Sequence, residues 1–148
     1  MPTLHEATAT WRGDLSAGTG TVTTQSAVLK RAGTSWKERT EGTGAAGLTS
    51  PEELLAAAHA SCFSMAFAAR LAKAGVVDPD IEVTAVVTFG AAAGGGNGVL
   101  SSALSVRAQA PNGDAAALRT LAEDAKENCP ISKALKGNVA LSVEARPR

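Results

Sequence analysis

Two cysteines are the residues in this 148-residue chain best suited to redox chemistry, and their local sequences differ sharply. Cys62 lies inside a long apolar run, whereas Cys129 is followed at once by Pro130. A thiol among apolar neighbours is usually unreactive, because desolvation disfavours the thiolate that carries out the chemistry. If Cys62 is a nucleophile, it therefore needs a cation nearby.

The cysteine pair also allows interpretations without catalysis. Free cysteine is among the most buried residue types, so Cys62 alone is typical of a small core residue. A structural disulfide between Cys62 and Cys129 would close a long loop and constrain the unfolded chain. The two cysteines and two histidines show no paired ligand spacing, which argues against zinc. We accordingly predict no zinc site.

Length and composition limit the class of protein. The length suits a single domain, residues 1–148, with a core of its own. No apolar run near 18 residues is free of charge, and residues 1–6 lack the pattern of a signal peptide. We therefore expect a soluble, cytoplasmic protein that does not enter a membrane. The 14 basic and 14 acidic residues, with 3% aromatic residues, provide neither a basic patch nor a stacking surface for nucleic acid.

The first third of the chain has the composition of β-strands. Thr3–Trp11 and Gly20–Leu29 are rich in β-type residues, and the Gly13-Asp14 turn between them predicts a hairpin. A further short strand is expected at Trp36–Thr40, followed by a loop that several glycines interrupt.

The strongest secondary-structure signal is a helix from Pro51 to about Ala74. Ser50 can cap this helix, Pro51 suits its first position, and Glu53 completes a capping box. Gly75 is the expected stop. Apolar residues cover more than one face, which predicts a buried central helix packed on a sheet and on a second element, such as another copy of itself.

The second half of the chain alternates strands and helices. We expect a hairpin of Ile81–Phe89 and Leu100–Ala110, then a helix from Asp114 to about Asn128. A short helix over Pro130–Lys136 and a strand over Asn138–Ala145 follow. Antiparallel hairpins and helices in this order predict an α+β fold.

Six segments of the chain form a recognisable set. They are Trp11-Arg12-Gly13-Asp14, Gly18–Val22, Arg39–Gly42, Ser50–Leu55, Ala57–Met65 and Asn128–Ser132. This set resembles the OsmC/Ohr family of organic hydroperoxide reductases, and its Trp-Arg-Gly-Asp opening is closer to the osmotically inducible protein C (OsmC) branch. The resemblance implies antiparallel sheets packed around a long central helix, in an intertwined homodimer.

The resemblance also implies an activity and the residues that perform it. Such proteins are cysteine peroxidases, without metal or haem, that reduce organic hydroperoxides to alcohols under oxidative or osmotic stress. By position, Cys62 matches the attacking cysteine, Cys129 the resolving cysteine, and Arg39 and Glu52 the catalytic arginine and glutamate. Because relatives tend to have a bulky apolar residue where Thr40 follows Arg39, Arg31 is the alternative arginine. The implied reductant is a dithiol such as a dihydrolipoyl protein.

The chemistry of a thiol peroxidase explains why these residue types would be needed. A guanidinium remains charged, so it can stabilise the thiolate and the departing alkoxide. A carboxylate in a bidentate pair would fix that guanidinium, which suits Glu52. Glu52 equally suits a simpler role as an acidic residue in the first turn of a helix.

Glu52 and Cys62 do not easily meet within one chain. Ten residues of helix separate their Cα atoms by about 15 Å and place them on different faces. If both serve one site, the glutamate comes from the partner subunit of a twofold dimer. Such a dimer would also cover the second apolar face of the helix.

Three further features surround the expected nucleophile. Condensation of a Cys62 sulfenic acid with Cys129 would protect it from irreversible oxidation. His59, one helical turn before Cys62, is either a catalytic base or, as we favour, a buried residue with a structural hydrogen bond. Phe63, Met65 and Phe67 are first of all core residues, although at a dimer interface they could line an apolar pocket for organic peroxides.

Two other functional classes remain open. A thiol-based redox sensor would use the same cysteine pair but needs a surface for a partner or operator, which the balanced charge does not provide. A non-enzymatic protein that binds a small ligand would keep the apolar pocket and would not need Cys129. Loss of peroxide consumption in Cys62→Ser would separate the enzyme from both.

Overall fold

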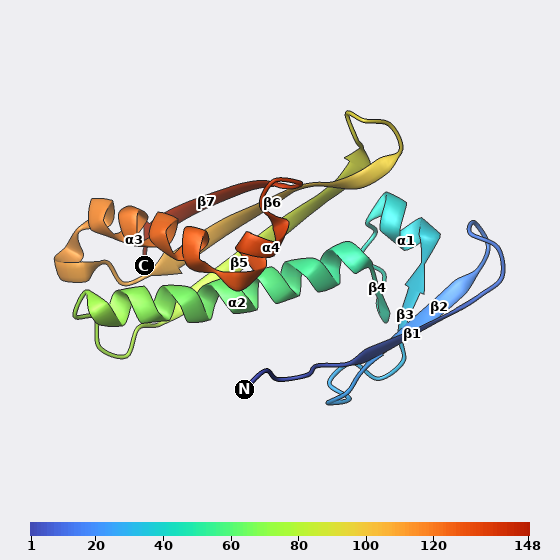
Figure 1. The fold of residues 1–148 in the computed structure, drawn as a ribbon, viewed down its shortest axis with the longest axis horizontal. Coiled ribbons are helices and arrows are strands. Elements are labelled where there is room, and N and C mark those ends of the chain that lie inside the picture. Colours follow the sequence, from blue (N-terminus) through green and yellow to red (C-terminus); the bar gives the residue numbers. More distant parts are fainter. The chain divides into compact units, whose positions relative to one another are not determined.

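The computed structural model describes residues 1–148, and the chain divides into two compact units, Met1–Leu54 and Leu55–Arg148 (Figure 1). Each unit contains one β-sheet and helical structure, and one long helix begins in the first unit and continues in the second. The predicted α+β class is confirmed.

The N-terminal unit is built on a four-stranded sheet. Its strands are β1 (Ala7–Arg12), β2 (Thr19–Thr24), β3 (Ala32–Ser35) and β4 (Leu48–Thr49), in that order across the sheet. The predicted first hairpin is confirmed as the antiparallel β1–β2 pair. Gly20 lies opposite Trp11 in this pair, where an added Cβ would come within 2.8 Å of the indole ring, so that the position requires glycine.

The segment predicted as a strand at Trp36–Thr40 is helical, and that prediction was wrong. Helix α1 spans Trp36–Glu41. The Oγ of Ser35 accepts a hydrogen bond from the Glu38 amide at 3.1 Å, and Gly42 ends the helix with φ 59°. The β-type residues Trp36 and Thr40 suggested a strand, but the capping residues at both ends determine the local structure.

Helix α2 spans Pro51–Lys73 and agrees closely with the prediction. The Oγ of Ser50 accepts a hydrogen bond from the Glu53 amide at 3.1 Å, as a capping residue does. The Glu53 carboxylate does not return to the cap but accepts from Thr49 Oγ1 at 2.5 Å. Gly75 follows the helix with φ 84°, a conformation that favours glycine.

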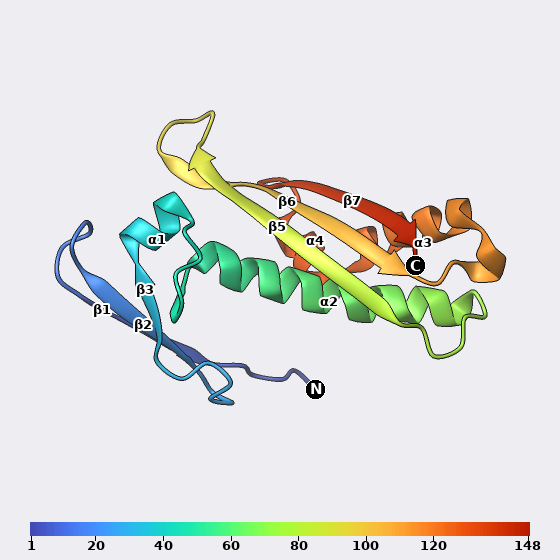
Figure 2. The ribbon, with the colours of Figure 1, turned by 180° about the vertical axis from the view of Figure 1, so that it is seen from behind.

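The C-terminal unit has a three-stranded sheet in the order β5 (Ile81–Ala91), β6 (Asn97–Ala108) and β7 (Ala140–Pro147). A short 3-10 turn (Pro111–Gly113) leads from this sheet into α3 (Ala115–Asn128), which α4 (Pro130–Leu135) follows. Figures 1 and 2 show that α2, α3 and α4 lie on one face of the sheet. The core between helices and sheet includes Phe63, Phe67, Leu71, Leu104, Val106 and Leu118.

Each sheet adds one parallel pair to its antiparallel hairpin. Strand β3 pairs in parallel with β4, and β6 pairs in parallel with β7. The antiparallel pairing expected for the sheets thus holds for β1–β2–β3 and β5–β6. The last strand of each sheet is instead parallel to its neighbour. For β7, the helices α3 and α4 provide the crossover that a parallel connection needs.

By length and composition alone, α2 could cross a membrane. Its side chains give that composition another explanation, because Phe63, Phe67 and Leu71 are fully buried against the sheet and α3. The helix therefore has the character of a core helix on this face.

Candidate active site

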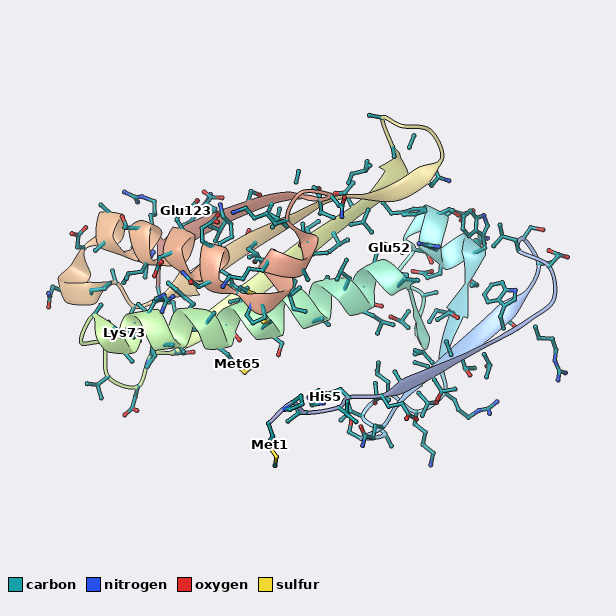
Figure 3. The ribbon with its side chains drawn as sticks, viewed as in Figure 1. Met1, His5, Glu52, Met65, Lys73 and Glu123 are labelled. Atoms are coloured by element: carbon teal, nitrogen blue, oxygen red, sulfur yellow. The ribbon has the colours of Figure 1, made fainter.

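An arginine–glutamate pair lies in the N-terminal unit. Arg39, on α1, donates from Nε to both carboxylate oxygens of Glu52 at 3.1 and 3.2 Å, and from Nη2 to Oε1 at 2.9 Å. Glu52 is in the first turn of α2, beside α1 in Figure 3. Its side chain is 8% exposed and that of Arg39 is 33% exposed. This geometry fixes the plane of the guanidinium while leaving part of it accessible.

Aromatic residues complete the surroundings of Arg39. Its guanidinium carbon lies 5.8 Å from the centre of the Trp36 ring, within the range of a cation–π contact. Arg39 also borders a cavity of about 390 Å³, which Trp11, Leu15, Trp36 and Leu54 line together with it. The charged pair is therefore at the edge of an apolar hollow.

The structure distinguishes the two candidate arginines by their contacts. Arg39 meets Glu52, whereas Arg31 is exposed and has φ 53°. The backbone amide of Arg31, just before β3, donates to Thr23 Oγ1 at 3.0 Å. Of the two, only Arg39 is held by the glutamate that the sequence singled out.

The two cysteines come together in the C-terminal unit. Both are free thiols; Cys62 is half-buried on α2 and Cys129 is fully buried. Cys129 ends α3 and precedes α4 in an extended conformation with φ −65° and ψ 124°, with Pro130 as the first residue of α4. The Cys-Pro step thus separates two helices and leaves Cys129 near enough to Cys62 to raise the pKa of the Cys62 thiol.

The environment of Cys62 favours its neutral form. Burial is the main cause that raises the pKa of the Cys62 thiol, and the hydrogen bond to Cys129 raises it further. A hydrogen bond from the Ile131 amide acts in the opposite direction and lowers this pKa. The net direction is upward, so at this thiol burial outweighs the Ile131 amide.

Cys62 opens onto a cavity of about 390 Å³. Met65, Ala66, Ala69 and Arg70 line it from α2, and Asn128 and Pro130 line it from the α3–α4 junction. Met65 is 66% exposed and points away from the sheet in Figure 3, which differs from its expected role as a core residue. The neighbouring Phe63 and Phe67 are fully buried, as expected for the core.

His59 is fully buried, and both of its ring nitrogens are hydrogen-bonded. Nδ1 lies 2.7 Å from Ser102 Oγ on β6, and Nε2 lies 2.8 Å from Ser132 Oγ on α4. Desolvation lowers the pKa of His59, so the ring is neutral at pH 7. The expectation of a buried, hydrogen-bonded histidine is confirmed.

Sequence reasoning missed the partners of these residues. Ser102 and Ser132 lie 43 and 73 residues from His59, so no local pattern connects them. Trp36 was assigned to a strand, and its contact with Arg39 was not foreseen. The serine–glutamate spacing of Ser35 and Glu38 is a capping signal that could have revealed α1, and with it the place of Trp36 and Arg39.

Comparisons with known proteins now place these features in a family. The model of the OsmC-like protein family matches residues 42–144. Peroxiredoxin OsmC of Escherichia coli (strain K12) is 36% identical over 145 residues, covering 97% of this chain and 99% of that protein. An organic hydroperoxide resistance protein of Xanthomonas axonopodis pv. citri is 33% identical over 96 residues, covering 64% of this chain and 65% of that protein.

The solved structures agree with this relationship. The crystal structure of the organic hydroperoxide resistance protein OhrB of Bacillus subtilis superimposes with a TM-score of 0.72 at 29% identity, covering 95% of this chain and 98% of that one. This chain belongs to the OsmC family. The nearly complete match to peroxiredoxin OsmC, against the partial match to the Xanthomonas protein, agrees with the OsmC branch expected from the sequence.

Proposed function

We propose that this chain reduces organic hydroperoxides to alcohols, with Cys62 as the nucleophile and Cys129 as the resolving thiol. The observation that carries the proposal is the proximity of two free thiols, one half-buried beside a cavity and one fully buried. The names of the relatives, peroxiredoxin and organic hydroperoxide resistance protein, support the same reaction.

In the first step, the Cys62 thiolate attacks one oxygen of the peroxide bond. The sulfur supplies the electron pair of the new S–O bond, the O–O bond breaks, and the alkoxide leaves and takes up a proton to become the alcohol. Cys62 is oxidised to a sulfenic acid. Because burial raises the pKa of this thiol, a positive charge must approach it before the step can proceed at neutral pH.

In the second step, the Cys129 sulfur attacks the sulfenic sulfur of Cys62. A disulfide forms, the S–O bond breaks, and water leaves with the thiol proton. A dithiol reductant then reopens the disulfide by exchange and is itself oxidised. A dihydrolipoyl group is the reductant that the family resemblance implies.

The activating charge is assigned to Arg39, held by Glu52. Because Arg39 and Glu52 pair within one chain, we assign both to the same subunit and Cys62 to its partner. The rise of about 15 Å between Glu52 and Cys62 along one helix supports this division. The guanidinium would lower the pKa of the thiol and stabilise the departing alkoxide.

A homodimer would provide such a composite site. The residues Ala58, Ser61, Met65, Ala69 and Ala72 on α2 are exposed and recur at helical spacing. They form a seam of small side chains around one methionine, and such a seam allows close approach of a second helix. We assign this seam to the contact with the α2 helix of the partner subunit.

The cavity beside Cys62 suits an organic substrate. Its walls include Met65, Ala66, Ala69 and Pro130, which offer apolar surface to an alkyl chain. We assign the protein to a reducing cytoplasm, where free thiols persist and the disulfide is a transient intermediate. We propose no nucleic-acid or membrane partner.

The test is peroxide consumption by the purified protein with a dithiol reductant. We expect turnover of an alkyl hydroperoxide in the natural chain and none in Cys62→Ser. A redox sensor would be oxidised without multiple turnovers, and a ligand-binding protein would bind small apolar molecules equally well after either cysteine is replaced. Turnover by Cys62→Ser equal to that of the natural chain would contradict the proposal.

A further inference from the structure

His59 connects three elements of the C-terminal unit through neutral hydrogen bonds. Its two nitrogens bind Ser102 on β6 and Ser132 on α4, at 2.7 and 2.8 Å. All three residues are buried, with exposed fractions of 0%, 0% and 2% for His59, Ser102 and Ser132. We call this arrangement the serine–histidine clamp. Buried polar groups in mutual contact restrict the positions of the elements that carry them.

The clamp holds without adding charge. A neutral imidazole donates at one nitrogen and accepts at the other, and each serine hydroxyl can serve in either role. Because desolvation lowers the pKa of His59, the neutral form is the stable one. The clamp therefore leaves the charge around Cys62 unchanged, and its effect is on position.

The clamp acts on the helix that follows Cys129. Ser132 is in the first turn of α4, and the amide of its neighbour Lys133 binds the carbonyl oxygen of Cys129 at 3.0 Å. The amide of Ile131, between Cys129 and Ser132, lies near enough to Cys62 to lower the pKa of its thiol. Fixing Ser132 to α2 thus fixes the segment that presents both Cys129 and the Ile131 amide to Cys62.

A second attachment lies on the other side of Cys129. Arg70 on α2 is paired with Asp124 on α3, and Asn128 Nδ2 donates to Asp124 Oδ1 at 2.9 Å. The last turn of α3 is therefore tied to α2 as well. Along α2, Cys62 lies between His59 and Arg70. The α3–α4 junction that contains Cys129 is therefore attached to α2 on both sides, through Asp124 before it and Ser132 after it.

We infer that His59 and Ser132 are positioning residues for the resolving step, because they hold α4 so that the Cys129 thiol stays beside the sulfur of Cys62. The inference rests on the proposed function. In that step the Cys129 sulfur forms the S–S bond, the S–O bond of the Cys62 sulfenic acid breaks, and water leaves. Peroxide attack, which precedes this bond formation, does not depend on Cys129.

The chain offers a matched pair of variants for the test. Ser132→Ala removes the bond from His59 to α4, and Ser102→Ala removes the bond from His59 to the sheet. Each leaves one histidine nitrogen without its buried partner, so both variants should lose similar stability in denaturant unfolding. Only the first loosens the attachment of Cys129.

Rapid mixing with an alkyl hydroperoxide separates the two steps. We expect the rate of sulfenic acid formation at Cys62 to be the same in both variants and in the natural chain. Disulfide formation should be about tenfold slower in Ser132→Ala, since displacement of a reacting atom by about 1 Å can cost up to about a hundredfold. Mass spectrometry should then find sulfinic acid at Cys62 in this variant, and not in Ser102→Ala.

A second measurement needs no peroxide. An aromatic disulfide reagent labels Cys62 as a mixed disulfide and releases one aromatic thiolate, and Cys129 then displaces the second with formation of the Cys62–Cys129 bond. The second release should be slower by the same factor in Ser132→Ala. If the natural chain forms no sulfenic acid but shows this pattern, the proposed function fails and the positioning role stands. Equal second-release rates in both variants would overturn the positioning role.

Discussion

The N-terminal and C-terminal units carry opposite kinds of chemistry. In the first, Arg39 and Glu52 form a charged pair at the edge of an apolar cavity. In the second, two thiols, a neutral histidine and two serines lie together, and burial raises the pKa of Cys62. The N-terminal unit holds an arginine–glutamate pair and no cysteine. The C-terminal unit holds both cysteines, and the one arginine beside Cys62 in its cavity, Arg70, is paired with Asp124. In the proposed function, the charge that activates Cys62 therefore comes from the N-terminal unit of the partner subunit.

The largest expected effects come from the two thiols themselves. Cys62→Ser should abolish peroxide reduction, whereas Cys129→Ser should reduce one equivalent and then stop, because no second thiol condenses with the sulfenic acid. The measurement is alcohol formed per protein, with Cys62 oxidation followed by mass spectrometry. Repeated turnover by Cys129→Ser without an added monothiol would remove the resolving role.

The division between units predicts complementation between inactive chains. A mixed dimer of Glu52→Ala and Cys62→Ser chains should regain about one working site, because the Cys62→Ser chain supplies its intact Glu52 to the intact Cys62 of its partner. Activity is measured after subunit exchange that mass spectrometry confirms. Exchange without any recovered activity would place Glu52 and Cys62 of one site in the same chain.

Removal of the charge should affect both the rate and the titration of Cys62. Arg39→Ala should slow peroxide attack by about a hundredfold, the scale of losing one electrostatic contact to a developing oxyanion. It should also raise the pKa of the Cys62 thiol, read from thiolate absorbance against pH. Arg31→Ala is the matched control and should change neither; the reverse result would transfer the role to Arg31.

The apolar surface beside Cys62 predicts a graded substrate preference. Each methylene of an alkyl hydroperoxide that reaches Met65 and Ala69 should add up to about 0.8 kcal/mol, or about fourfold in kcat/KM. Hydrogen peroxide should be the weakest substrate. A flat series from hydrogen peroxide to longer alkyl hydroperoxides would show that the cavity does not contact the organic group.

The smallest expected effect is on stability against pH. The pKa of folded His59 lies below its unfolded value of about 6.5, so the unfolded chain gains a proton first as the pH falls. The free energy of unfolding should therefore fall below about pH 6.5, by at most about 1.4 kcal/mol per pH unit. In His59→Gln, the free energy of unfolding should no longer fall between about pH 6.5 and 5. Carboxylates titrate below this range, so they do not account for a slope within it. If the variant keeps the same pH dependence of the free energy of unfolding, groups other than His59 cause it.

The sequence predicted those parts of the molecule that local signals determine. Ser50 and Pro51 marked the start of α2, and Cys129-Pro130 marked the junction of α3 and α4. These features depend on capping and on the missing amide of proline, which act over a few residues. They also located both cysteines on the elements that now bring them together.

Other features depend on contacts between distant residues and could not be derived in this way. The parallel pairing of β7 with β6 is chosen by the path of α3 and α4 and not by the strand's own residues. The partners of His59 come from β6 and α4, and no spacing in the sequence indicates them. Helix α1 could have been predicted from its capping residues Ser35 and Gly42. The β-type residues in this short segment favoured a strand instead.

The distribution of aromatic residues has a spectroscopic consequence. The chain has two tryptophans and no tyrosine, and both tryptophans border the cavity next to Arg39 in the N-terminal unit. Indole emission therefore reports on that unit alone, while the helical circular dichroism comes mainly from α2 and α3. Unfolding followed by the two signals should coincide if the units melt together and separate if they do not, so an unmodified chain carries its own probe of their coupling.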